Sequence, residues 1–177
     1  MENRVKQKKF VSLVLYLHNA QNEVVPFFQK VLPVFRDNFT NFEIVCVNDA
    51  CTDGTIGVLK EYLEENHCSE MVNIIHMSFF HGLESAMNAG RDLAIGDFIY
   101  EFDTAYVDYP SELIMEVYDK LLEGNDIVSA GTRDHVRMTS GFFYFCYNKT
   151  SRGRGKIGPE TFRIVSRRAI NRIKSIG

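Results

Sequence analysis

Short apolar runs alternate along the chain with longer segments in which apolar residues recur every three or four positions. Runs rich in β-branched residues are typical of buried strands, and the wider spacing is typical of amphipathic helices. The runs predicted to be strands are residues 11–17, 43–48, 72–77, 98–102 and 126–130. This alternation predicts an α/β fold with a mostly parallel sheet and helices on both faces.

The segments between these strands carry helix start and stop signals. Helices are predicted over residues 24–35, 52–63, 81–96, 110–124 and 166–176. Pro33 is expected to kink the first of them, Thr52 or Asp53 to cap the second, and Gly96 to end the third. Residues 141–148 fit a strand or a helix, and residues 151–158 are predicted to form a loop because they are rich in glycine and charge.

Composition limits the class of protein. The chain has 177 residues, of which 45% are apolar and 24% charged, so residues 1–177 fit one globular domain. Its four cysteines form no C-x-x-C pair, which favours reduced thiols over a disulfide framework or a zinc site. No apolar run approaches the roughly 18 residues that span a bilayer, and the first run fits a strand better than a signal peptide. We therefore expect a cytoplasmic protein.

Charge is unevenly distributed along the chain. Residues 151–177 contain eight Lys and Arg residues and a single acid, Glu160, whereas the whole chain has a net charge of −3. A basic end on an acidic body suggests an anionic partner such as phosphate, pyrophosphate or a lipid headgroup; a solvated basic helix is the alternative. Nucleic acid is not expected, because no nucleic-acid-binding motif accompanies the charge.

Three polar residues stand just after predicted strands. They are Asn19, Asp49 and Asp103. Ligands of open α/β sheets bind outside the carboxyl ends of the strands, so these side chains are expected to converge on one crevice. The alternative is that they only terminate strands, which Asn and Asp often do. The turn after the first strand reads HNAQNE and lacks the G-x-G-x-x-G of dinucleotide-binding folds, and no Walker A motif occurs.

Six stretches, in order along the chain, resemble the motifs of family 2 glycosyltransferases. They are VSLVLYLHNAQNE, VCVNDACTDGT, HGLESAMNAGRDLAIGD, FDTAYVDYPSE, AGTRDHVR and ETFRIVSRRA, within residues 11–169. The nearest group is that of the polyprenyl-phosphate and dolichol-phosphate sugar synthases. The resemblance implies a GT-A fold and an inverting transfer of a sugar from a nucleotide-diphosphate sugar. The implied acceptor is a polyprenyl phosphate or a growing cell-surface glycan, as in polysaccharide biosynthesis.

The resemblance also implies roles for the strand-end residues. Asn19 and Asp49 match positions that hold the nucleoside in this family. Asp103 matches the first acid of the D-x-D element, which binds Mg²⁺ or Mn²⁺ and the nucleotide-sugar. Asp108 matches the trailing acid of the same element and is a further candidate metal ligand, or it caps the following helix. Ala105 stands where the family usually has the second acid, which is the direct metal ligand.

Two later motifs add basic and acidic candidates. Arg133, Arg137 and Arg163 match arginines expected near the diphosphate or a phosphate-bearing acceptor; pairing with carboxylates inside the protein is the alternative. Thr161 replaces the acid that the family commonly uses at the acceptor and catalytic site. The neighbouring Glu160 is therefore the candidate catalytic residue that orients or deprotonates the acceptor.

The departures from the family pattern leave two questions open. Glu101 shares a strand face with Asp103, so it either supplies the missing metal ligand or lies deeper in the sheet in an ion pair. Ala20, Ala105 and Thr161 replace acids of the family, which makes a catalytically weakened relative, acting as a nucleotide-binding or acceptor-binding partner module, the alternative function. The resemblance also implies a domain truncated at its C-terminal end, with the basic end at the inner face of a membrane.

Overall fold

A six-stranded sheet forms the centre of the molecule. The computed structural model describes residues 5–131 and 161–175. The strands are β1 (Val11–Leu17), β2 (Phe42–Asn48), β3 (Val72–His76), β4 (Phe98–Phe102), β5 (Ile127–Ala130) and β6 (Phe162–Ser166). Their order across the sheet is β3-β2-β1-β4-β6-β5, and β1 to β4 pair in parallel while β6 runs antiparallel to both of its neighbours. The predicted mostly parallel sheet is confirmed.

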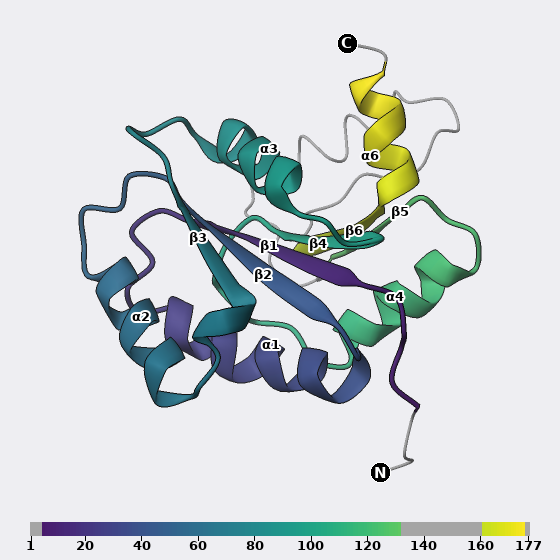
Figure 1. Cartoon of the computed structure of the whole chain (residues 1–177), viewed down its shortest axis with the longest axis horizontal. Helices are drawn as coiled ribbons and strands as arrows, with labels where there is room; N and C mark the ends of the chain where they lie inside the picture. Colours follow the sequence, from purple (N-terminus) through teal and green to yellow (C-terminus); the bar gives the residue numbers. More distant parts are fainter. Residues whose placement is uncertain (1–4, 132–160, 176–177) are drawn as a thin grey trace, which may run out of the picture.

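Helices cover both faces of this sheet, as predicted (Figure 1). They are α1 (Val24–Asn38), α2 (Thr55–Glu65), α3 (Leu83–Leu93), α4 (Leu113–Leu122) and α6 (Arg167–Lys174), with a short 3₁₀ helix at Ser69–Met71. Figure 1 places α1, α2 and α4 below the sheet and α3 and α6 above it. Arg133, Arg137, Glu160 and the segments 141–148 and 151–158 lie outside the described residues.

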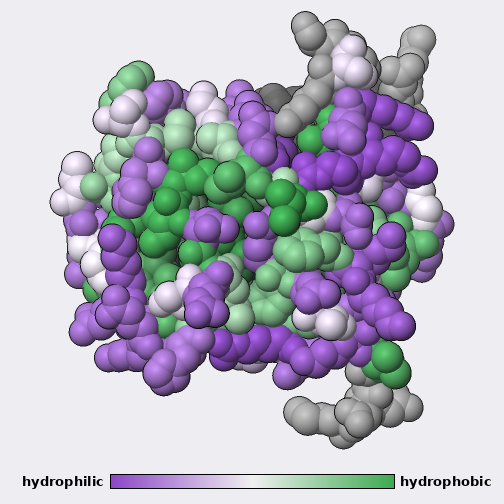
Figure 2. Space-filling view, in the orientation of Figure 1, coloured by the Kyte–Doolittle hydropathy of each residue, from purple (hydrophilic) through white to green (hydrophobic). Residues whose placement is uncertain are grey.

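Two apolar clusters fill the space between the helices and the sheet. The larger one, under α1, α2 and α4, is rich in aromatic rings; Tyr100 of β4, for example, packs at 5.2 Å between ring centroids against Phe35 of α1. The smaller one joins α3 and α6 to Val14, Val45 and Val47 of β1 and β2. Edge strand β3 carries partly buried apolar residues, and Figure 2 shows the resulting apolar surface at the centre of the view.

Several details differ from the predictions, and one of them is that α4 begins at Leu113 and not at Pro110. Strand β6 was not predicted, because Arg163 interrupts its short apolar run. Helix α3 ends at Leu93 and not at Gly96, which lies against Ser12 of β1; an added Cβ at Gly96 would be 2.6 Å from the Ser12 backbone nitrogen. Helix α2 begins after Gly54 and not after Thr52 or Asp53, although the Asp53 carboxylate accepts a hydrogen bond from the Thr55 N–H at 3.0 Å.

The basic residues of α6 contact the rest of the domain. Arg168 and Arg172 form ion pairs with Asp126, at 2.8 and 3.7 Å, and the guanidinium of Arg167 donates to the backbone oxygens of residues 94 and 96. Asp126 also accepts a hydrogen bond from the Ser166 hydroxyl at 2.7 Å. Part of the positive charge of residues 151–177 is thus paired with groups of the same domain. In the part of the chain that the structure describes, no helix is both long and apolar enough to cross a membrane.

Gly90 allows α3 to approach the sheet closely. An added Cβ would lie 2.9 Å from Cγ2 of Val47 and closer still to Cγ1 of Val14, both in the smaller core. We expect Gly90→Ala to lower the free energy of unfolding by about 1–3 kcal/mol through overpacking, measured by urea denaturation. Gly57→Ala is the control, because nothing lies within 4 Å of its added Cβ. Equal effects of the two substitutions would contradict the close packing of α3.

Asp126 is expected to make stability depend on pH. The hydrogen bonds from Ser166 and Arg168 lower the pKa of this carboxyl below its ordinary value of 3.8. A carboxyl with a lowered folded pKa adds stability above its unfolded pKa, and this stability is lost as the pH falls through the folded pKa. Asp126→Asn should therefore lower the melting temperature at about pH 7 and lower it less near pH 2. Glu61→Gln, at an exposed acid of α2, should change neither value.

Candidate functional site

The carboxyl ends of the parallel strands bring the predicted strand-end residues to one edge of the sheet. Asn19 follows β1, Asp49 follows β2 and Asp103 follows β4. The side chain of Asn19 is turned toward the loop after β2, where its Oδ1 accepts the N–H groups of Thr52 at 2.8 Å and Asp53 at 3.4 Å. Asn19 adopts a positive φ of 53°, which Asn tolerates better than most residues. It therefore links the first two loops of the edge.

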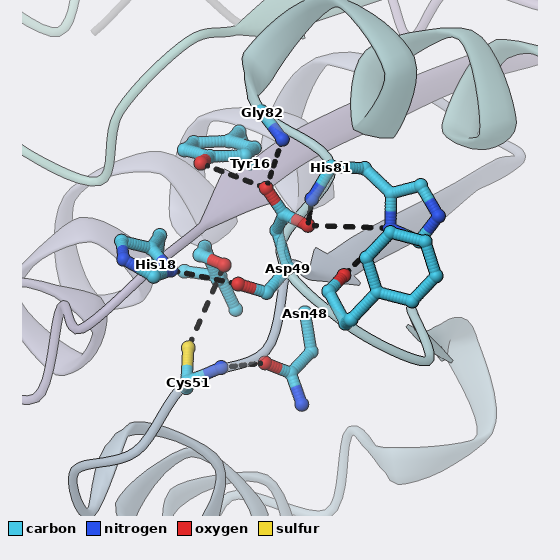
Figure 3. A network of polar contacts seen from close by, with 9 residues as sticks. Tyr16, His18, Asn48, Asp49, Cys51, His81 and Gly82 are labelled. Carbon is cyan, nitrogen blue, oxygen red and sulfur yellow. Dashed lines mark hydrogen bonds and ion pairs between the residues drawn. The ribbon is translucent and has the colours of Figure 1, made fainter.

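Asp49 is the buried centre of this edge (Figure 3). Its side chain has no exposed surface, and its carboxylate accepts the N–H groups of His81 and Gly82, each at 2.8 Å. The Tyr16 hydroxyl donates to the same carboxylate at 3.1 Å. Gly82 is the N-cap of α3 and has a positive φ of 82°, so the negative charge lies at the positive end of that helix. Asp49 thus fixes the start of α3 against β1 and β2.

Neighbouring side chains complete the network around Asp49. The Nδ1 atom of His18 lies 2.7 Å from the Asp49 backbone oxygen, and the Oδ1 atom of Asn48 accepts the Cys51 N–H at 2.9 Å. Burial, together with the hydrogen bond to Asp49, raises the pKa of Tyr16 to about 12, so its hydroxyl stays a donor at neutral pH. The ends of β1 and β2 are therefore held as one unit.

Two exposed aromatic rings stand beside this network. Phe79 and Phe80 precede α3 and are 64% and 57% exposed. The Phe80 ring lies 4.7 Å from the imidazole of His18, and the Phe79 ring stacks on His81 at 3.9 Å between centroids. Large exposed rings on a preformed loop offer flat surfaces on which another ring can stack. Sequence reasoning did not single out these two residues, because isolated Phe residues in a loop carry no motif.

Charged groups gather on the α3 face of β4. Glu101 is 2% exposed and forms ion pairs with Arg91 of α3 at 2.6 Å and Arg163 of β6 at 2.5 Å. The ion-pair reading of Glu101 is thus confirmed. Arg163 also approaches Asp103, with 3.5 Å between its Nη2 and the Oδ1 atom. Arg91 was not identified from the sequence, since its partner becomes visible only when α3 packs on the sheet.

The described residues do not make a divalent-cation site by themselves. Ala105, at the second position of the D-x-D element, is 2% exposed and belongs to the hydrophobic core. Asp103 already contacts a guanidinium, and Asp108 is exposed on the loop that follows. Over residues 5–131 and 161–175, no three His, Cys, Asp or Glu side chains are grouped as a metal site requires. A cation at Asp103 would therefore need ligands beyond these side chains.

Comparison with known proteins bears on the family. A model described as glycosyl transferase family 2 matches residues 12–176. An uncharacterized glycosyltransferase of Synechocystis sp. is 32% identical over 174 residues, which cover 94% of this chain and 53% of that protein. A prophage bactoprenol glucosyl transferase homolog of Escherichia coli (strain K12) is 30% identical over 173 residues, which cover 93% of this chain and 54% of that protein. This chain thus spans about half the length of these relatives.

A solved structure bears on the fold. The mannosyltransferase PcManGT from Pyrobaculum calidifontis, in complex with GDP-Man and Mn²⁺, matches with a TM-score of 0.65 at 18% identity. The match covers 94% of this chain and 47% of that chain. The GT-A fold that the motifs implied is therefore confirmed.

Substitution of Asp49 tests whether its carboxylate organises the edge. In Asp49→Asn, an amide NH₂ would replace either Oδ1, which accepts the His81 N–H, or Oδ2, which accepts the Gly82 N–H and the Tyr16 hydroxyl. We expect the free energy of unfolding to fall by about 2–4 kcal/mol, because buried donors lose their acceptor. Tyr16→Phe removes one donor and keeps the carboxylate, so it should cost about 1 kcal/mol. Urea denaturation measures both values, and a smaller loss for Asp49→Asn than for Tyr16→Phe would contradict this role.

Proposed function

The chain belongs to glycosyl transferase family 2, and we propose that it transfers a sugar from a nucleotide-diphosphate donor to an acceptor. The observation that carries this proposal is the arrangement at the carboxyl edge of the sheet. There the loops fixed by Asp49 stand beside a second set of charged residues around Asp103. The loops around Asp49 suit a nucleoside, and the charged residues around Asp103 suit a diphosphate.

We propose that the nucleoside binds at the loops after β1, β2 and β3. Phe79 and Phe80 expose rings on which a base can stack. Asp49 has no exposed surface, so its contribution is to hold the loops that receive the nucleoside. Asn19 has the same function in the loop after β1, because its side-chain oxygen binds the N–H groups of the next loop.

We propose that the diphosphate binds toward β4. Arg163 provides a guanidinium on a side chain that is 26% exposed, and it stands beside Asp103 at the same strand end. Fixed cations near a leaving group stabilise the negative charge that develops as the glycosyl bond breaks. The assignments of Arg133 near the diphosphate, Glu160 as the catalytic residue, and Asp103 with Asp108 as ligands of Mg²⁺ or Mn²⁺ stay predictions. PcManGT was solved with Mn²⁺, which supports a cation in proteins of this fold.

The proposed reaction is a single displacement with inversion at the sugar. An acceptor oxygen attacks the anomeric carbon, the new glycosyl bond forms on the opposite face, and the nucleoside diphosphate leaves with the bonding electrons. Holding both reactants in this geometry supplies much of the rate enhancement. An acceptor phosphate is already ionised at neutral pH and needs no general base, whereas a hydroxyl acceptor would need one.

The proposed acceptor is a polyprenyl phosphate. The relative from Escherichia coli is named for bactoprenol glucosyl transfer, which supports a lipid-phosphate acceptor over a growing glycan. We further propose that transfer takes place at the cytoplasmic face of a membrane, where such a lipid presents its phosphate. The basic residues Arg167, Arg168 and Arg172 of α6 have partners within the domain, and the side chains of Arg168 and Arg172 are also exposed.

A donor screen tests this function in the full-length protein. Polyprenyl phosphate is incubated with UDP-sugars and GDP-sugars in the presence of Mn²⁺, and release of the nucleoside diphosphate is measured with and without the acceptor. We expect acceptor-dependent release from one donor, and a loss of at least about 10-fold in kcat for Asp103→Asn. Glu116→Gln is the matched control. This exposed acid belongs to α4, which covers the face of the sheet opposite α3, so its substitution should not affect kcat.

Two outcomes would contradict the proposal. Nucleotide binding without release across the whole donor set would favour the alternative of a catalytically weakened partner module, for which the buried Ala105 is the motivating observation. Equal activity of Asp103→Asn and Glu116→Gln would instead show that the reaction does not take place at the end of β4.

A further inference from the structure

Glu101 is an acid buried in the middle of the α3 face of the sheet. It lies directly opposite Arg163 in the antiparallel pairing of β4 with β6. Each of its oxygens has its own arginine, with Oε1 at 2.6 Å from Nε of Arg91 and Oε2 at 2.5 Å from Nε of Arg163. A carboxylate with 2% exposure requires such partners, since an unpaired buried charge is strongly destabilising. Glu101 therefore fixes the position of the Arg163 guanidinium.

The other end of this guanidinium points to the end of β4. With Nε committed to Glu101, the Nη2 atom of Arg163 lies 3.5 Å from Oδ1 of Asp103. A guanidinium is a rigid planar fork, so fixing one nitrogen also fixes the direction of the others. Both side chains of this second contact are partly accessible, Arg163 at 26% and Asp103 at 32%. The Oδ1 atom of Asp103 is itself buried, so a ligand would reach this pair through the exposed remainder of the two side chains.

This arrangement changes what Asp103 can bind. A dication at Asp103 would be repelled by a guanidinium held within about 4–6 Å. Ala105 cannot offset the repulsion, because it brings a buried methyl group where the D-x-D element has an acid. A diphosphate would offset it, since its negative oxygens can contact the arginine and a cation together.

We propose that Arg163, held by Glu101, is the counter-charge of Asp103 in the nucleotide-free protein, and that a divalent cation reaches this loop only together with the donor's diphosphate. This inference rests on the proposed function for the identity of the diphosphate. It makes Glu101 a positioning residue that acts through Arg163. The site proposed here thus differs from one in which two carboxylates bind the cation before the nucleotide arrives.

Binding of Mn²⁺, followed by the electron paramagnetic resonance signal of the free ion, tests the proposal in the full chain. Without nucleotide, we expect no binding that depends on Asp103. With UDP or GDP, we expect Mn²⁺ to be bound at least about 10-fold more tightly than by the nucleotide in buffer. Asp103→Asn should remove that gain. Neither measurement, with or without nucleotide, requires sugar transfer.

Substitutions of Arg163 test its part directly. Arg163→Gln should raise the affinity of the nucleotide-free protein for Mn²⁺ about 10-fold, because Asp103 loses its neighbouring positive charge. Arg163→Lys keeps a cation for Glu101 if the first variant unfolds, and one ammonium cannot serve both carboxylates, so we expect a smaller rise of the same sign. Arg168→Gln is the matched control, because it removes an arginine paired with Asp126 and should not change Mn²⁺ binding.

The outcomes separate the inference from the proposed function. Asp103-dependent binding of Mn²⁺ to the nucleotide-free wild-type protein would overturn the inference and leave the proposed function intact. An unchanged affinity in folded Arg163→Gln and Arg163→Lys would overturn it as well. Failure of every nucleotide to bind would instead contradict the proposed function.

Discussion

The buried carboxylate of Asp49 is the interaction on which the carboxyl edge of the sheet depends. It accepts two backbone N–H groups at the start of α3 and the hydroxyl of Tyr16 from β1, so one side chain joins β1, β2 and α3. Removal of this acceptor would leave partly buried donors without their partner. The neighbouring loop, which exposes Phe79 and Phe80, keeps its position because Asp49 holds its last residues.

The acids of this edge differ in what neutralises them, and that difference gives each a separate function. Asp49 is satisfied mainly by backbone amides, Glu101 by two arginines, and Asp103 shares one of those arginines while remaining 32% exposed. The first two have almost no exposed surface and hold the structure around them. Asp103 and Arg163 are thus partly accessible charges at the end of β4, which is where the proposed diphosphate would bind.

Much of this architecture could be predicted from the sequence, because strands β1 to β4 are uninterrupted apolar runs and their ends carry polar residues. Strand β6 was not predicted because Arg163 interrupts its apolar pattern. A charged residue at this position is explained only by the folded sheet, in which Glu101 lies opposite Arg163. Gly96 was wrongly assigned to a helix end. Glycine occurs both at helix ends and where two backbones meet closely, and the sequence does not distinguish the two cases. The partners of Asp49 could not be predicted, since backbone amides have no signature in a sequence.

Hydrogen exchange of the two amides that bind Asp49 tests most directly whether this carboxylate holds the edge together. The N–H groups of His81 and Gly82 precede the first turn of α3, where amides without an acceptor normally exchange fast. In the wild-type protein at neutral pH, we expect both amides to exchange as slowly as amides within β1 and β2. Exchange at the rate of the amide of Ser78, an exposed residue of the same loop, would contradict the account.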